Sequence, residues 1–180
     1  MKSPVNWYNG LLQRKPLATK SVSCMAIFTL GDILSQTFEK KLSKTQKFDW
    51  QRSARVGMYG GVFAGPSLHF YYSYILPYLI PGSSMKSIVK KICFDQTVGV
   101  SIMISMFYTV QTLLNKGTFT DVRNNIAANY WTTLKTNWMF WPPLMFLNFT
   151  FVPIQFQVLF VNVFGVAWNG YLSFVQYSNK

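Results

Sequence analysis

Acidic residues are scarce in this sequence. Of its 180 residues, 17 are Lys or Arg, but only five are Asp or Glu. Charged residues of both signs make up 12% of the chain, against roughly 25% in soluble domains. Three long stretches, 56–85, 96–115 and 136–179, contain no charged residue at all. Because half of the residues are also hydrophobic, the composition excludes an ordinary soluble domain and predicts a protein embedded in lipid.

The side chains that carry most enzyme chemistry are few as well. Cys24 and Cys93 are the only cysteines, and each lies in or beside an apolar segment, where free cysteine behaves as a small hydrophobic residue. This arrangement argues against a disulfide framework. His69 is the only histidine, so a two-histidine metal site cannot be assembled, and glycine-rich phosphate loops are absent. We therefore expect a protein that is not an enzyme and that has no cofactor and no metal.

Basic residues give the chain a formal net charge of +12. This charge could suggest nucleic acid as a partner, but the basic residues are scattered between apolar runs and form no continuous face. Nucleic-acid binding is therefore not expected. Anionic membrane lipids, such as cardiolipin, are the better partner for basic residues at the edges of apolar segments.

The first 16 residues form a basic segment. They include Lys2, Arg14 and Lys15, whereas the first acidic residue of the chain is Asp32. Aromatic and leucine residues at positions 7, 8, 11 and 12 recur at helical spacing. The pattern predicts an amphipathic helix in the membrane interface and resembles a mitochondrial targeting sequence. A solvated basic tail is the alternative. The last three residues do not match the peroxisomal Ser-Lys-Leu tag.

The remaining residues, 17–180, predict one membrane domain with an all-α fold. As a single helix, the uncharged stretch 136–179 would be about 66 Å long, twice the roughly 30 Å of a bilayer core. We expect it to break at Pro142, Pro143 and Pro153, because proline lacks a backbone donor and clashes with the preceding turn. The predicted architecture is an integral membrane helix bundle with about four transmembrane helices, a half-helix and interfacial amphipathic helices, and with both chain ends on one side. The expected spans are 17–38, 52–78, 88–115 and 153–177, the half-helix is 142–151, and the interfacial helices are 3–15 and 119–140.

Three glycines, Gly57, Gly61 and Gly65, repeat at every fourth position of the second expected span. This spacing leaves one helix face without side chains, so that another backbone can approach closely. We therefore predict a helix-packing seam within the chain. A phosphate-binding loop is the alternative, but the sequence lacks the strand and the lysine that such a loop requires.

Polar and ionisable side chains in or beside the apolar segments form a candidate intramembrane polar network. A charge without a partner at the centre of a membrane helix costs ~2.5–3.5 kcal/mol, so these side chains are expected to pair or to line a wet cavity. For Asp32 we expect a donor from another helix, with Arg55 as the first candidate and Arg52 as the second. Hydrogen bonding that holds helices together and a permeation path remain alternative interpretations. The candidate members are Asp32, Gln36, Arg52, Arg55, His69, Asp95, Gln96 and Asn148.

A series of motifs runs through most of the chain. The first part of the series contains Gly31, Asp32, Ile33, Ser35, Gln36, Asp49, Arg52, Arg55, Gly65, Pro66, His69, Tyr71, Asp95 and Gln96. The closing motif, within 137–173, contains Trp138, Trp141, Pro142, Asn148, Phe149, Val152, Pro153, Trp168, Asn169, Tyr171, Leu172 and Ser173. In residue type and order, the series resembles the Mpv-seventeen / peroxisomal membrane protein (twenty-two-kilodalton) family. The resemblance implies a small integral protein of the mitochondrial inner membrane, or alternatively of the peroxisomal membrane, that acts as a pore or supports metabolite balance.

Two positions depart from that family's pattern. Met145 stands where the relatives have a glutamine, and Gln157 stands where an arginine is usual. Both changes remove polarity from the region where a polar lumen would need it. They favour a non-enzymatic protein that supports membrane and metabolite homeostasis, or a structural subunit of a larger mitochondrial membrane complex such as a respiratory assembly. A channel for small solutes or ions is the alternative.

Overall fold

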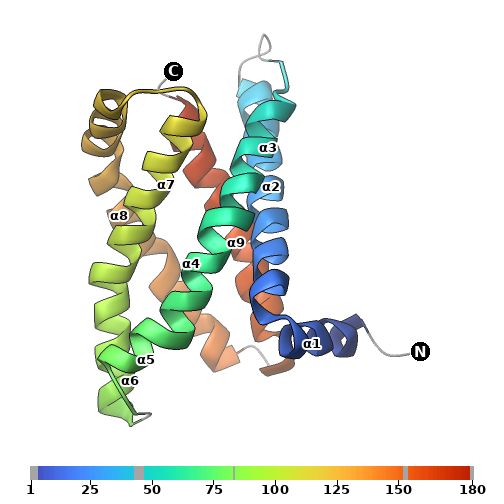
Figure 1. Ribbon diagram of the computed structural model, residues 1–180, viewed down its shortest axis with the longest axis vertical. Coiled ribbons are helices and arrows are strands. Elements are labelled where there is room, and N and C mark those ends of the chain that lie inside the picture. The colour runs from blue at the N-terminus through green and yellow to red at the C-terminus, as the bar shows by residue number, and fades with distance from the viewer. Residues whose placement is uncertain (1–3, 43–46, 83, 152–153, 179–180) are drawn as a thin grey trace.

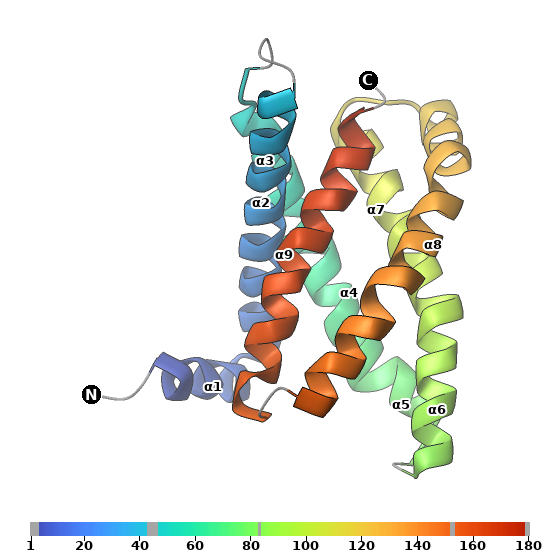
Figure 2. The same ribbon diagram turned by 180° about the vertical axis from the view of Figure 1, so that it is seen from behind.

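The computed structural model describes residues 4–42, 47–82, 84–151 and 154–178, and every element within these ranges is helical. The predicted all-α fold is therefore confirmed. In this part of the chain, five long rods run alternately in opposite directions along the longest axis of the molecule (Figures 1 and 2). The rods are α2, α3 to α5, α6 to α7, α8 and α9. A shorter helix, α1 (Pro4–Arg14), lies crosswise at one end of the bundle (Figure 1).

The first two rods form a long hairpin. Helix α2 (Pro16–Leu42) starts with a proline, whose missing N–H would have no partner within the first helical turn anyway. The second rod starts at the N-cap Asp49, whose carboxylate accepts a hydrogen bond from the backbone N–H of Arg52 at 3.0 Å. It contains α3 (Trp50–Met58), the π-helical segment η1 (Tyr59–Ala64), α4 (Gly65–Phe70), a second π-helical segment η2 (Tyr71–Ile75) and α5 (Leu76–Leu79).

The third rod contains α6 (Met85–Phe94), the π-helical segment η3 (Asp95–Gly99) and α7 (Val100–Leu114). The hydroxyl of Ser84 caps its start by accepting a hydrogen bond from the N–H of Ser87 at 3.3 Å. At its end, the N–H of Gly117 donates to the carbonyl of Thr112 at 3.0 Å, which turns the chain back towards the fourth rod.

Helix α8 (Phe119–Phe151) corrects the prediction of an interfacial helix at 119–140 followed by a half-helix at 142–151. It is one helix of 33 residues that continues through Pro142 and Pro143. The two carbonyls that lose their helical donors belong to Trp138 and Met139, whose side chains lie on the exposed face of the bundle. Membrane helices tolerate such prolines because neighbouring groups and small local adjustments compensate for the missing hydrogen bonds.

Because α8 runs the length of the bundle, α9 (Ile154–Ser178) starts at the opposite end from the one that four spans would imply. As a result, α1 lies at one end of the molecule and the carboxyl end of α9 at the other (Figures 1 and 2). The expectation of both chain ends on one side is therefore wrong. Residues 152–153, with Val152 and Pro153 of the closing motif, lie outside the described ranges.

The bundle buries polar as well as apolar side chains and exposes many large apolar ones. Buried side chains include charged and amide groups, among them Asp32, Arg52 and Gln111. Large apolar side chains are exposed along the bundle, for example Val22 on α2 and Ile102 on α7. Among the described residues, two helices are long and apolar enough to cross a membrane: Pro16–Lys41 and Met85–Leu114. This surface suits lipid, and the five rods of the described residues do not confirm the predicted count of four spans.

The glycines of the second rod lie against α2. A side-chain carbon at Gly57 would lie 2.2 Å from the Thr29 hydroxyl oxygen, and one at Gly65 would lie 2.6 Å from the backbone Cα of Ser21. At Gly61 the neighbouring atom is the methyl carbon of Met25, at 2.6 Å. At Gly65 the obstacle is backbone, so only a hydrogen atom fits there, and all three glycines let the first two rods pack closely.

Candidate functional site

A buried cluster of charged side chains ties together α2, α3 and α9. Asp32, Glu39 and Arg52 expose 0%, 7% and 4% of their surface. The Arg52 Nε donates to Asp32 Oδ1 at 2.8 Å, while its two terminal nitrogens donate to the two oxygens of Glu39 at 2.6 and 2.7 Å. Such a two-pronged contact is the strongest arrangement between an arginine and a carboxylate. The ring of Tyr177 on α9 completes the site, because the guanidinium carbon lies 4.1 Å from its centre.

The Asp32 carboxylate has its remaining hydrogen bonds filled by neutral side chains. Oδ2 accepts from the Gln36 amide at 2.8 Å and from the Ser53 hydroxyl at 2.6 Å. Oδ1 accepts from the hydroxyl of Ser173 on α9 as well as from Arg52. With four donors around one carboxylate, the arrangement is suited to holding three helices together.

The closing motif packs against the start of the motif series. A side-chain carbon at Gly31 would lie 2.8 Å from the Asn169 Cβ and from the Gly170 nitrogen, so α2 and α9 touch backbone to backbone next to Asp32. The Asn169 amide donates to the Gly165 carbonyl at 2.8 Å, within α9. Two sequence regions about 140 residues apart, around 31 and around 170, therefore form one packed contact.

The other predicted polar residues lie in separate places. Arg55 does not reach Asp32; it forms an exposed ion pair with Asp49 at 3.4 Å. His69 is buried on α4, where its Nδ1 lies 3.3 Å from both the Lys20 ammonium and the Ser73 hydroxyl. The side chains of Asn148, Phe149 and Gln157 lie outside what the structure describes. The predicted polar network is therefore divided between the charged cluster, the His69 site and a central cavity.

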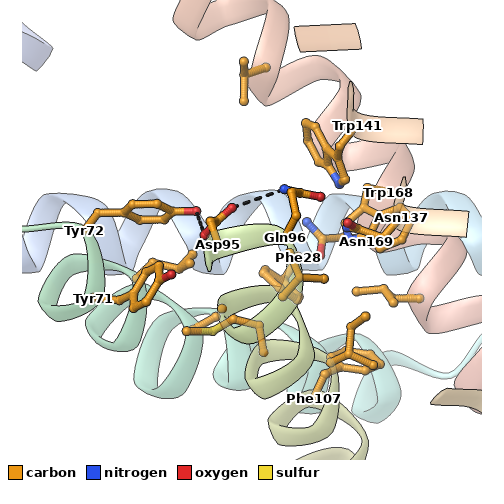
Figure 3. A pocket seen from close by; sticks show the side chains of 18 of the residues that line it. Phe28, Tyr71, Tyr72, Asp95, Gln96, Phe107, Asn137, Trp141, Trp168 and Asn169 are labelled. Carbon is orange, nitrogen blue, oxygen red and sulfur yellow. Dashed lines mark hydrogen bonds between the residues drawn. The ribbon is translucent and has the colours of Figure 1, made fainter. Parts of the chain in front are cut away.

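The cavity has a volume of about 380 Å³ and lies between the rods. Its size falls in the lower part of the range of roughly 300–1,000 Å³ that is usual for ligand pockets. Most of its surface is apolar and aromatic (Figure 3). The aromatic side chains are Phe28, Tyr59, Tyr71, Tyr72, Phe107, Trp141 and Trp168.

One group of polar side chains in the cavity wall surrounds Asp95. The Asp95 carboxylate accepts hydrogen bonds from the Tyr72 hydroxyl at 2.8 Å and from the Gln96 amide at 3.2 Å (Figure 3). The Tyr71 hydroxyl lies near the same carboxylate, since a side-chain carbon at Gly99 would be 2.6 Å from it and 2.9 Å from Asp95 Oδ1. In the described part of the chain, the lining contains no Lys, Arg or His, so its formal charge is that of Asp95 alone.

Two amide oxygens in the cavity wall lack hydrogen-bond donors. They are Gln96 Oε1 and Asn137 Oδ1, which are buried and make no hydrogen bond with a described residue. Figure 3 shows the Gln96 oxygen pointing away from Asp95, to the side where Asn137 and Trp141 lie. A buried acceptor without a donor costs about 1–3 kcal/mol, so such a pair marks a place where a donor from outside the protein would stabilise the site.

The sequence contained a signal for Glu39, which we did not select. Ser35, Gln36 and Glu39 follow Asp32 at intervals of three, four and seven, which puts all of them on one face of α2. That spacing alone indicates that Glu39 belongs to the Asp32 cluster. No comparable sequence signal places Asn137 in the cavity wall, because its position there depends on α8 continuing past Pro142.

The family model of the Mpv17 / PMP22 family matches residues 112–173. The chain is 33% identical over 172 residues to Protein sym-1 of Neurospora crassa, covering 95% of this chain and 98% of the relative. It is 31% identical over 177 residues to Protein SYM1 of Kluyveromyces lactis, covering 97% of this chain and 90% of the relative. Peroxisomal membrane protein 2 of Bos taurus is 31% identical over 169 residues, with 92% of this chain and 86% of the relative covered. No solved structure matches.

These relatives align with almost the whole chain. The residues of the motif series also lie together in the fold, since Gly31 and Asp32 contact residues of the closing motif region: Asn169, Gly170 and Ser173. The apolar exterior and the charged interior suit a protein surrounded by lipid. The chain is a membrane protein that belongs to the Mpv17 / PMP22 family.

Proposed function

We propose that this protein is a non-enzymatic protein of the mitochondrial inner membrane that contributes to metabolite balance by holding a small solute in its central cavity. The observation that carries the proposal is the cavity itself, with about 380 Å³ of aromatic-walled space and two buried amide oxygens without donors. Ligand sites between helices of a bundle have this composition: mostly apolar walls with a few polar groups that orient the ligand.

The walls favour solute binding over an open water-filled channel. Met145, one of the two positions that depart from the family pattern, lines the cavity together with apolar side chains of α7 and α9. Apolar constrictions expel water and so block ions. The proposed state therefore conducts ions poorly, because its apolar walls disfavour a continuous file of water.

The basic helix α1 supports the proposed location, since it resembles a mitochondrial address and carries an exposed Trp7 next to the membrane-facing bundle. The name of the bovine relative refers to the peroxisomal membrane, which is the alternative location. A structural subunit of a larger complex, such as a respiratory assembly, is the second candidate role. Native electrophoresis in mild detergent tests that role, because a subunit would comigrate with a large complex.

Filling the cavity tests the proposed function. Val161 on α9 lines the cavity, whereas Val163, two residues further along the same helix, is exposed on its outer face. Val161→Phe adds ring volume inside the cavity, and Val163→Phe makes the same chemical change towards lipid. We expect proteoliposomes with the unmodified protein to take up part of a mixture of small metabolites, as measured by mass spectrometry.

We expect Val161→Phe to lower this uptake at least fivefold and Val163→Phe to leave it unchanged. Equal uptake by all three proteins would contradict a role for the cavity. Strong ion conductance in planar bilayers by the unmodified protein would instead favour an open channel.

A further inference from the structure

We infer that the cavity selects small organic cations, with an ammonium group held by Asp95 and the body of the solute against the aromatic walls. This inference rests on the proposed function, since it names the class of solute that the cavity holds. It follows from the charge of the lining, from the unpaired acceptors and from the aromatic rings.

Asp95 stands out among the acidic residues of the chain. Of the five, Asp32 and Glu39 contact Arg52, and Asp49 pairs with Arg55. Asp121 lies at the surface, where it accepts hydrogen bonds from Thr118. Asp95 forms no ion pair with any described residue, although the chain holds 17 basic residues. Its carboxylate is instead held by two neutral donors in the cavity wall, which leaves room for a cation from outside.

The cavity wall holds further groups that favour positive charge and N–H donors. Gln96 Oε1 and Asn137 Oδ1 are acceptors without donors, and Asn137 exposes only 5% of its surface. An ammonium group carries N–H donors that the Asp95 carboxylate can accept, and the two unpaired oxygens add negative partial charge to the same cavity. Trp141 and Trp168 line the same cavity, and the faces of indole rings attract cations.

Anionic metabolites do not fit this lining. A phosphate or carboxylate would require Lys, Arg or a series of free N–H groups, and the described lining contains no basic side chain. It would also lie close to the Asp95 carboxylate, and like charges in a low-dielectric cavity repel strongly. With about 380 Å³, roughly the volume of a dozen water molecules, the cavity accommodates a small amine and not a large one.

Three probes of similar size test the inference: phenethylammonium, the neutral 2-phenylethanol and the anion 3-phenylpropionate. Each is titrated into the purified full-length protein in nanodiscs, and binding is measured by isothermal titration calorimetry and by the shift in melting temperature. We expect phenethylammonium to bind about tenfold or more tightly than 2-phenylethanol, because charge-assisted hydrogen bonds and cation–π contacts together exceed the 1.4 kcal/mol that a tenfold ratio represents. We expect no binding of 3-phenylpropionate.

Asp95→Asn should abolish the advantage of the ammonium probe while 2-phenylethanol still binds. Asp121→Asn, which removes an acidic residue far from the cavity lining, is the matched control and should leave all three affinities unchanged. If Asp95→Asn fails to fold, the order of the three probes on the unmodified protein still decides the question.

Equal binding of the alcohol and the ammonium, or binding of the anion, would overturn the cation inference but leave the cavity as a solute site. Failure of all three probes would also overturn the inference. The proposed function would fall with it only if Val161→Phe and Val163→Phe also left solute uptake unchanged.

Discussion

Arg52 is the side chain whose removal should harm the bundle most, because one guanidinium holds two buried carboxylates. It contacts Asp32 at 2.8 Å and Glu39 at 2.6 Å, and the three groups carry formal charges of +1, −1 and −1. Arg52→Ala therefore leaves two negative charges facing each other inside the protein. Asp32→Ala, in contrast, leaves the neutral pair of Arg52 and Glu39 intact.

The free energies of unfolding should follow this count of charges. Removing one partner of a buried ion pair costs about 3–5 kcal/mol, and Arg52→Ala is expected near the upper end because it strands two carboxylates. Asp32→Ala is expected to cost about 1–3 kcal/mol, since it leaves the donors of Gln36, Ser53 and Ser173 without their acceptor. In the double variant the repulsion between the carboxylates is gone, so its cost should fall short of the sum by about 1–3 kcal/mol.

Reversible unfolding in mixed micelles with increasing SDS, followed by circular dichroism, measures these free energies. Arg55→Ala is the matched control, because Arg55 lies three residues away in an exposed ion pair with Asp49 at 3.4 Å and should cost only about 0–1 kcal/mol. The reasoning is refuted if Arg52→Ala costs no more than Arg55→Ala. It is also refuted if the losses from Arg52→Ala and Asp32→Ala simply add.

Two further predictions concern packing and capping. Gly65→Ala should cost about 1–3 kcal/mol of unfolding free energy in the same assay, because its new methyl group meets the backbone of Ser21. Gly10→Ala is the control, since a side-chain carbon there has nothing within 4 Å and should not destabilise the protein. Equal effects of the two changes would contradict close packing of α2. Hydrogen bonds from the Thr118 N–H and hydroxyl lower the pKa of Asp121. The ionised carboxylate therefore stabilises the fold above the usual carboxyl pKa of about 3.9, and this contribution is lost as the pH falls through the lowered pKa. The melting temperature of Asp121→Asn should therefore lie below that of the unmodified protein at pH 7, and the difference should shrink as the pH falls below the usual carboxyl pKa. A constant difference would contradict this.

Local spacing predicted the parts of the fold that depend on one helix face. The repeat of Gly57, Gly61 and Gly65 indicated a close helix contact, and in the structure α2 lies against these glycines. The need of Asp32 for a donor also followed from its place in an apolar segment. The choice of Arg55 over Arg52 was wrong, because Arg52 is buried against α2, where it reaches Asp32, whereas Arg55 pairs with Asp49.

Long-range consequences of proline could not be predicted from the sequence. Proline removes one donor and disfavours helix in the residue before it, which predicts a break at Pro142 and Pro143. In α8 the helix nevertheless continues, because packing against α7 and α9 outweighs the local cost. That one difference changes the bundle from four rods to five among the described residues and moves the carboxyl end to the opposite side.

The cavity also depends on departures from regular α-helix. The three π-helical segments, Tyr59–Ala64, Tyr71–Ile75 and Asp95–Gly99, supply seven of its lining residues: Tyr59, Ala64, Tyr71, Tyr72, Asp95, Gln96 and Gly99. A π-helical turn holds an additional residue, so it rotates the side chains that follow relative to a regular helix, and such segments are frequent at functional sites. In a regular helix the period of 3.6 residues would assign different residues to this face. Sequence periodicity therefore finds the apolar outside of this bundle but not the polar groups of its cavity. Asp95 and its neighbours face one cavity only because the π-helical turns change the direction of their side chains.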